Sequence, residues 1–139
     1  METLIHLDTH VVVWLYAGDV KRLAPARPWL EHHDLVVSPM VKLELAFLCD
    51  IGRLKQHADE VIRDLVERVG LRMASVSFSE AVERAVPCPW TRDPFDRLIV
   101  GTALAAGAPL LTADQTIHRH CPNAVWKASR RVRPTTSRR

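Results

Sequence analysis

The chain has 139 residues, of which 47% are hydrophobic and 25% are charged. This length and composition fit one globular domain and exclude fibrous and wholly disordered proteins. No stretch reaches the roughly 18 consecutive apolar residues of a membrane-spanning helix, and the N-terminus lacks the basic and then apolar pattern of a secretory signal. The three cysteines are odd in number and lack CxxC spacing, which argues against a disulfide framework or a zinc ribbon. We therefore expect a cytoplasmic protein with no membrane partner.

Basic and acidic residues are unevenly distributed along the chain. Lys and Arg number 19 and Asp and Glu 16, which gives a net charge of +3. Residues 127–139 hold six of the basic residues and no acid, so residues 1–126 carry 13 bases against 16 acids. We expect residues 127–139 to form a basic, disordered tail, because they have little apolar surface to bury. Such a tail can attract phosphate backbones without specificity, so it is assigned no function.

Short apolar runs rich in β-branched residues alternate with segments of helical period, which is typical of a parallel α/β sheet. In the first half of the chain the predicted elements are a strand over 4–7, a helix over 9–17, a helix over 24–33 and a strand over 35–37. Ser38 can cap the next helix and Pro39 suits its first position. That helix is predicted to reach about Gly52.

The second half of the chain continues the alternation of helices and strands. Its predicted elements are a helix over 56–69, a strand over 72–76, a helix from 77–79 onward, a helix over 94–106, a strand over 109–112, a short helix after 114 and an edge strand over 124–126. The intervals between the strands are long enough for the helical crossovers that join parallel neighbours. The sequence therefore predicts an α/β fold with a central parallel sheet flanked by helices.

Three acidic residues fit as helix N-caps. Asp8 follows the first strand, Asp114 follows the fourth, and Asp93 precedes a helix that begins with Pro94. Asp is a preferred N-cap residue, so capping explains each of these acids taken singly. Asp96 stands at the third position of its helix, where it could complete a variant of the reciprocal capping box.

Glu44 does not fit the capping pattern, because it lies more than one turn inside its helix. Its neighbours at three and four residues are all apolar: Met40, Val41, Phe47 and Leu48. Glu44 is therefore predicted to point from the buried stripe of the helix. An ionised carboxylate there needs a partner, a cation or a proton. A buried salt bridge stays open as an alternative, although Lys42 is too near in sequence to face Glu44.

These acids are predicted to converge on one edge of the sheet. In an open parallel sheet the strand-to-helix junctions share the carboxyl edge, where such folds bind ligands. The converging carboxylates would be those of Asp8, Glu44, Asp93, Asp96 and Asp114. Carboxylates crowded in this way repel one another, and Mg²⁺ or Mn²⁺ with an oxygen-rich shell is the natural remedy.

Four segments together resemble the PIN-domain ribonucleases, and most closely the VapC-type toxins of bacterial toxin–antitoxin pairs. They are LDTH at 7–10, SPMVKLEL at 38–45, RDPFDRLIVGTALAAG at 92–107 and LLTADQTI at 110–117. The resemblance spans Leu4 to Trp126, so we expect a PIN-like nuclease domain over 1–126 followed by the tail. It implies a three-layer fold, Mg²⁺- or Mn²⁺-dependent cleavage of RNA, a cognate antitoxin and a homodimer.

The resemblance also assigns roles to individual residues. The catalytic, metal-binding set that it implies is Asp8, Glu44, Asp96 and Asp114. Asp93 matches an acid common in the subgroup, for which capping is the better explanation, and Thr112 stands where the family often keeps a hydroxyl near the metal. His10 departs from the family, because many relatives have a small hydroxyl residue there. Arg92 and Arg97 flank the acidic helix start, where they could hold phosphate or form structural ion pairs.

Several other functions are weighed against the nuclease. A phospho-acceptor module would need paired acids after the first strand and a late Lys, and an aspartyl phosphatase would need DxDxT; neither pattern is present. His118, His120 and Cys121 lie close together, but their spacing matches no common zinc site. A noncatalytic PIN-fold adaptor or RNA-binding module is the remaining alternative. Stabilisation by added Mn²⁺ would discriminate a metal-binding domain from an adaptor without a site.

Overall fold

A five-stranded parallel sheet forms the centre of the protein in the computed structural model, which describes residues 3–128. The strands are β1 (Leu4–Leu7), β2 (Asp34–Val37), β3 (Arg72–Met73), β4 (Leu110–Leu111) and β5 (Ala124–Val125). Their order in the sheet is β3-β2-β1-β4-β5, so β1 is the middle strand. In the register of the sheet, Ile5 of β1 faces Leu35 of β2, and Leu7 faces Leu111 of β4. The predicted α/β class is confirmed.

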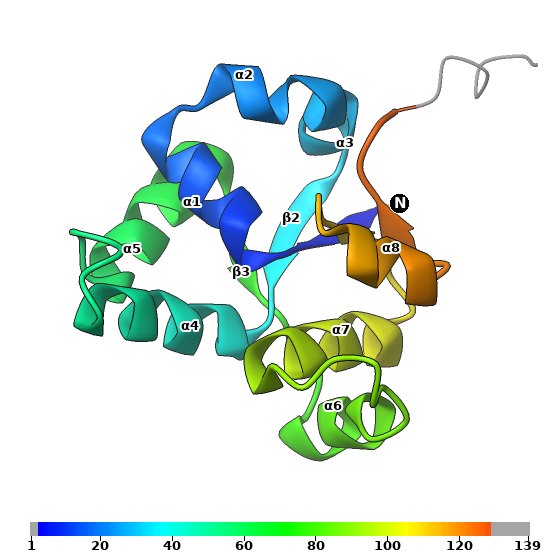
Figure 1. Ribbon diagram of the computed structural model, residues 1–139. Coiled ribbons are helices and arrows are strands. Elements are labelled where there is room, and N and C mark those ends of the chain that lie inside the picture. Colours follow the sequence, from blue (N-terminus) through cyan, green and yellow to red (C-terminus); the bar gives the residue numbers. More distant parts are fainter. Residues whose placement is uncertain (1–2, 129–139) are drawn as a thin grey trace, which may run out of the picture.

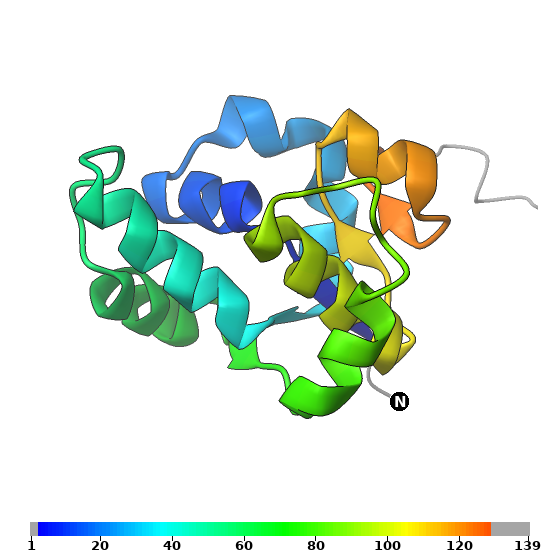
Figure 2. The same cartoon turned by 60° about the horizontal axis from the view of Figure 1, so that its bottom comes forward.

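Helices cover both faces of this sheet. The connections from β1 to β3 contain α1 (Thr9–Ala17), α2 (Val20–Leu23), the 3₁₀ turn η1 (Ala24–Ala26), α3 (Arg27–His32), α4 (Pro39–Asp50) and α5 (Ala58–Val69). The later connections contain α6 (Phe78–Ala85), α7 (Pro94–Ala106) and α8 (Gln115–His120). Because parallel strands are joined by right-handed crossovers, the two sets lie on opposite faces. Figures 1 and 2 show α1, α4 and α5 on one side of the strands and α7 and α8 on the other.

The predicted caps form at the helix starts. The side chain of Ser38 accepts a hydrogen bond from the amide of Met40, ahead of Pro39 at the first position of α4. Asp93 caps α7 in the same way by accepting from the amide of Phe95. At the other end of α7, Gly107 adopts a left-handed conformation with φ of 63°, which only glycine adopts without steric cost. These signals account for the close match between the predicted and observed bounds of α4 and α7.

Four predicted elements are wrong in extent. The helix expected over 24–33 consists of η1 and α3, because proline cannot donate a backbone hydrogen bond and Pro25 and Pro28 each stand at the start of a new turn. The strand expected over 72–76 ends at Met73. Its neighbour β2 ends at Val37, and the last bond between these strands is donated by the amide of Ala74. The strands expected over 109–112 and 124–126 are likewise only two residues long.

The core lies between the sheet and both helical layers. Its large, fully buried members include Ile5, Leu7, Leu45, Leu65, Ile99, Leu110 and Ile117. On the second face, α6 packs closely on α7 at Gly101. A Cβ atom at that position would overlap the carbonyl oxygen of Ala81 and lie 2.9 Å from the Cβ of Ala85. Glycine is therefore required there by the contact between the two helices.

The C-terminal end of the described chain returns to the first helical layer. The amide of Ala128 donates to the carbonyl of Pro25 (3.1 Å). The predicted disordered tail falls almost wholly on residues 129–139, which lie outside the described residues. Within residues 3–128, none of the helices has the length and apolar character needed to cross a bilayer.

Candidate metal centre

Four acidic residues from four separate segments line one cavity of about 250 Å³ at the carboxyl edge of the sheet. They are Asp8, Glu44, Asp96 and Asp114. Asp8 follows the middle strand β1 and Asp114 follows its neighbour β4, on either side of the point where the strand order reverses. This switch point is where open α/β sheets bind their ligands. Figure 1 shows the N-terminal ends of α4 and α7 meeting beside it, which brings Glu44 and Asp96 to the same place.

Both oxygens of the Asp8 carboxylate are held by hydrogen bonds, and the side chain is buried. Oδ1 accepts from the amide of Thr9 (2.8 Å), which caps α1 as predicted. Oδ2 accepts from the hydroxyl of Thr112 (2.7 Å). Asp8 therefore caps α1 and lines the acidic cavity at the same time. A carboxylate fixed in this way has its remaining lone pairs oriented before any ligand arrives.

Glu44 is half-buried at the edge of the apolar stripe of α4. The buried positions of the helix are Val41 and Leu45, whereas Phe47 is 45% exposed, so the predicted stripe is wrong at that residue. The hydroxyl of Thr9 donates to Oε1 of Glu44 (2.5 Å). Burial and the neighbouring charges of Asp8 and Asp93 raise the pKa of Glu44, and the bond from Thr9 opposes that rise.

Asp93 lies beside Glu44 and Asp96, as the predicted convergence of the acids implied. Carboxylate oxygens of Glu44, Asp93 and Asp96, one from each residue, all lie within 4.8 Å of one another. The reciprocal capping box expected for Asp96 is wrong, because the amide of Asp93 donates instead to the hydroxyl of Thr91 (3.3 Å). Asp96 is thereby left to face the cavity while Asp93 caps α7.

The electrostatics of the cavity are those of anions without a countercharge. Burial, and then the charges of Asp8, Asp93, Glu44 and Asp114, raise the pKa of Asp96 to about 7. Within residues 3–128, no Lys or Arg forms an ion pair with Glu44 or Asp96. Lys42, which was predicted not to face Glu44, pairs instead with Asp59 (2.7 Å). The salt-bridge alternative for Glu44 is therefore wrong within the described chain.

The turn after β4 is held by side chains of several elements. Asp114 caps α8 by accepting from the amides of Thr116 and Ile117 (2.8 and 3.2 Å). The amide of Asp114 donates to the hydroxyl of Thr112, which donates in turn to Asp8. Nε2 of His118 donates to the carbonyl of Thr112 (2.7 Å). Thr112 thus lies next to the cluster as predicted, and it joins the turns that follow β1 and β4.

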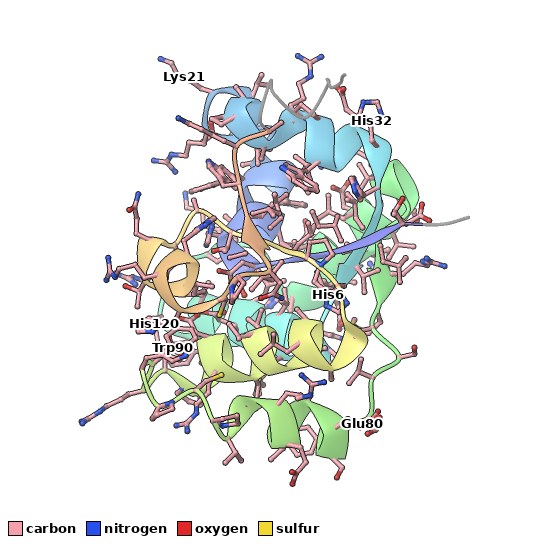
Figure 3. The ribbon with its side chains drawn as sticks, turned by 90° about the vertical axis from the view of Figure 1, so that its right-hand side faces the viewer. His6, Lys21, His32, Glu80, Trp90 and His120 are labelled. Carbon is pink, nitrogen blue, oxygen red and sulfur yellow. The ribbon has the colours of Figure 1, made fainter. Side chains whose placement is uncertain are left out.

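Arg97 and His120 have structural contacts, whereas Arg92 is exposed. The guanidinium of Arg97 donates to the carbonyls of Ala85 and Val86, so it serves packing between α6 and α7. The ring of His120 stacks on that of Trp90, with centroids 4.8 Å apart. Figure 3 labels the two residues beside each other. Among the described residues, the acidic group of Glu44, Asp93 and Asp96 is the one set with metal-ligating spacing. That group does not include His118, His120 or Cys121.

The sequence profile of the family described as "PIN domain" matches residues 5–121. The chain belongs to the PIN-domain family. It is 34% identical over 131 residues to Ribonuclease VapC22 of Mycobacterium tuberculosis, with 89% of this chain and 99% of that protein covered. Within the family it is of the VapC type, as the resemblance predicted.

Solved structures share the fold of this PIN domain at low sequence identity. VapBC2 from Rickettsia felis, bound to a DNA fragment from its promoter, contains a chain with a TM-score of 0.63 and 16% identity, with 98% of both chains covered. A toxin–antitoxin complex from Klebsiella pneumoniae contains one with a TM-score of 0.64 and 20% identity, covering 87% of this chain and 95% of that one. The predicted three-layer PIN-like architecture is confirmed.

Sequence reasoning missed two contacts of this PIN domain. One is the hydroxyl of Thr9 on Glu44, for which the available signal was its place directly after Asp8 at the carboxyl edge. The other is the imidazole of His10, which accepts a hydrogen bond from the amide of Ala113. His10 had been noted only as a departure from the family, and no spacing rule connects residues 10 and 113.

Proposed function

We propose that this PIN domain is a metal-dependent endoribonuclease that acts as the toxin of a toxin–antitoxin pair in the cytoplasm. The observation that carries the proposal is the cavity lined by Asp8, Glu44, Asp96 and Asp114, where carboxylates from four distant segments meet without a Lys or Arg partner in the described chain. Acids that served only as helix caps would not be expected to gather there, because burial and the neighbouring carboxylates disfavour the charged form of Asp96 and raise its pKa. The similarity to a VapC ribonuclease supports RNA as the substrate.

The donor set fits Mg²⁺ or Mn²⁺. Both ions prefer oxygen ligands and are held by a few carboxylates together with water. Asp8, Asp96 and Asp114, which line the cavity, would hold the ion, and Glu44 would help to position either the ion or a water molecule. Of these three, Asp96 belongs to the group of acids with metal-ligating spacing, and Asp8 and Asp114 do not. Asp93 and Thr112 are weaker candidates, since Asp93 is exposed and is not among the residues that line the cavity, and the hydroxyl of Thr112 already bonds Asp8 and Asp114.

When bound, the metal neutralises phosphate charge and lowers the pKa of an attacking water. The chain's own residues prepare the site for this chemistry. Thr112 and the amide of Thr9 fix the two oxygens of Asp8. The hydroxyl of Thr9 orients Glu44. Phosphodiester hydrolysis in this cavity therefore depends on carboxylates whose directions are set before substrate binds.

Two partners belong to the proposal. Solved structures with this fold come from complexes described as VapBC or toxin–antitoxin assemblies, which supports a cognate antitoxin for this chain. A homodimer remains a prediction from the family resemblance. Exposed apolar side chains on α4, such as Leu43 and Phe47, are compatible with either partner.

The proposal is tested by incubating the full chain with total RNA and Mg²⁺ and mapping the cut ends by sequencing. The Asp8→Asn and Asp96→Asn variants keep the side-chain shape but remove a charge. We expect each to slow cleavage by at least about a hundredfold, which corresponds to about 2.7 kcal/mol of lost transition-state stabilisation.

Asp50→Asn is the matched control, because Asp50 is exposed at the end of α4 away from the cavity. It should cleave RNA at the parent rate. If no cleavage depends on Asp8 and Asp96 in any metal or RNA pool, the nuclease proposal fails and the noncatalytic adaptor takes its place.

A further inference from the structure

The imidazole of His10 connects the two turns that carry Asp8 and Asp114. Nε2 of His10 accepts a hydrogen bond from the amide of Ala113 (2.9 Å), the residue before Asp114. Because Nε2 accepts, the proton of the neutral ring is on Nδ1. Nδ1 lies 3.6 Å from Oδ2 of Asp8, the oxygen that Thr112 also contacts. One side chain thus faces the first carboxylate and holds the backbone next to the last one.

The ring of His10 is held in this orientation by its surroundings. It packs against Trp14 and Trp126, with centroid distances of 4.9 and 6.5 Å. The two indoles also contact each other, with centroids 5.9 Å apart. His10 and Asp8 line the same cavity. The residue can therefore affect the geometry of the acidic cluster without itself supplying an oxygen ligand.

We propose that His10 is a positioning residue that sets the spacing of Asp8 and Asp114 and thereby raises the affinity of the cavity for a divalent cation. The proposal rests on the function proposed above. Carboxylates that bind a metal depend on outer hydrogen-bond partners for their orientation, and loss of such a partner costs about 10- to 100-fold in metal affinity. The acceptor at Nε2 is the atom that carries the effect, because it holds the backbone of the turn after β4.

Two substitutions separate this role from simple packing. His10→Phe keeps an aromatic ring against Trp14 and Trp126 but has no acceptor. His10→Gln loses the ring, but its amide oxygen can still accept from the amide of Ala113. The full metal-free chain is titrated with Mn²⁺, and free Mn²⁺ is measured by electron paramagnetic resonance. We expect His10→Phe to weaken Mn²⁺ binding about tenfold or more and His10→Gln to stay within about threefold of the parent.

His33→Phe provides the matched control. His33 is also partly buried, and its Nδ1 donates a hydrogen bond to the carbonyl of Trp29 (3.0 Å). Its ring packs on the indole of Trp29, but it lies outside the acidic cavity. Its substitution should lower the melting temperature and leave Mn²⁺ affinity unchanged.

The outcomes distinguish this proposal from the function on which it rests. A His10→Phe variant that binds Mn²⁺ as tightly as the parent, or a His10→Gln variant as weak as His10→Phe, would overturn the positioning role while the nuclease stands. A parent chain that takes up no Mn²⁺ would overturn the proposed function, and this inference with it.

Discussion

Asp96 opposes the stability of the metal-free protein, because its carboxylate is half-buried among other anions. Its pKa in the folded chain is raised to about 7 from the ordinary 3.8, chiefly by burial. Between these two values the folded chain keeps a proton that the unfolded chain releases. The free energy of unfolding therefore falls as the pH rises from about 4 to about 7. This cost to the fold agrees with the metal-binding role proposed for Asp96.

Asp96→Asn should consequently make the metal-free protein more stable at pH 8. The amide carries no charge, so the repulsion from Asp8 and Glu44 disappears. Thermal melts in the presence of EDTA should give a higher melting temperature than the parent at pH 8 and a smaller difference at pH 5. Exposed Asp50→Asn should show no such trend. An Asp96→Asn variant that melts below the parent at pH 8 would contradict the assigned burial and repulsion.

The sequence predicted which acids meet but not how they are held. Asp8 and Asp114 could be placed because each lies in the turn after a strand, and Glu44 because its neighbours at three and four residues are all apolar. The bonds from Thr9 to Glu44 and from Ala113 to His10 join segments 35 and 103 residues apart. Such contacts depend on side-chain rotamers and on the packing of α1 against the turn after β4, which no local pattern records.

At the scale of single elements, the middle strand carries an acid-sensitive residue. His6 of β1 is only 2% exposed, and Nδ1 has no hydrogen-bond partner among the described residues. Burial lowers the pKa of His6 from 6.5 to about 4. The unfolded chain therefore takes up a proton near pH 6.5 that the folded chain refuses until about pH 4. Figure 3 shows His6 inside the molecule and His32 at its periphery.

We expect the His6→Val variant to gain stability relative to the parent as the pH falls from 6.5 to 4. The parent loses up to about 1.4 kcal/mol of unfolding free energy per pH unit in this range through His6, and valine has no such dependence. Valine also suits a buried strand. Urea titrations at several pH values measure the difference, with exposed His32→Val as the control. Parallel pH profiles for the parent and His6→Val would contradict the prediction.

From the close contact between α6 and α7 we predict that Gly101→Ala destabilises the protein. In an ordinary helix, Gly→Ala adds about 1 kcal/mol of stability. At Gly101 the added Cβ would overlap the backbone of Ala81, and such overpacking costs about 1–3 kcal/mol. Gly101→Ala should therefore lower the urea midpoint. A higher midpoint would mean that α6 can shift away from α7 without loss.

The bounds of helices could be predicted where capping residues near in sequence determine them. Ser38 with Pro39, and Asp93 with Pro94, fix the starts of α4 and α7, and Gly107 fixes the end of α7. Errors arose where tertiary pairing decides the bounds. The length of β3 depends on where β2 stops offering hydrogen-bond partners, and that is set by the turn into α4.

For the whole molecule, a divalent ion should act as a stabilising ligand. A ligand that binds only the folded chain adds about 2.7 kcal/mol at a hundred times its dissociation constant. Mn²⁺ should therefore raise the melting temperature of the parent, and much less so for Asp8→Asn and Asp96→Asn. The melts are recorded in buffers without Ca²⁺, and EDTA added afterwards should return the melting temperature to its starting value if the rise is due to Mn²⁺. Equal shifts for the parent and both variants would favour the adaptor over the nuclease.

The strand order determines when the acidic cavity can form during synthesis of the chain. β1 is made first but lies between β2 and β4, and the turn that supplies Asp114 follows β4, near the end of the described chain. A nascent polypeptide still attached to the ribosome and ending before residue 110 lacks both the second neighbour of β1 and one wall of the cavity. The cavity can therefore form only after β4 and the turn that carries Asp114 have been synthesised and have left the ribosome.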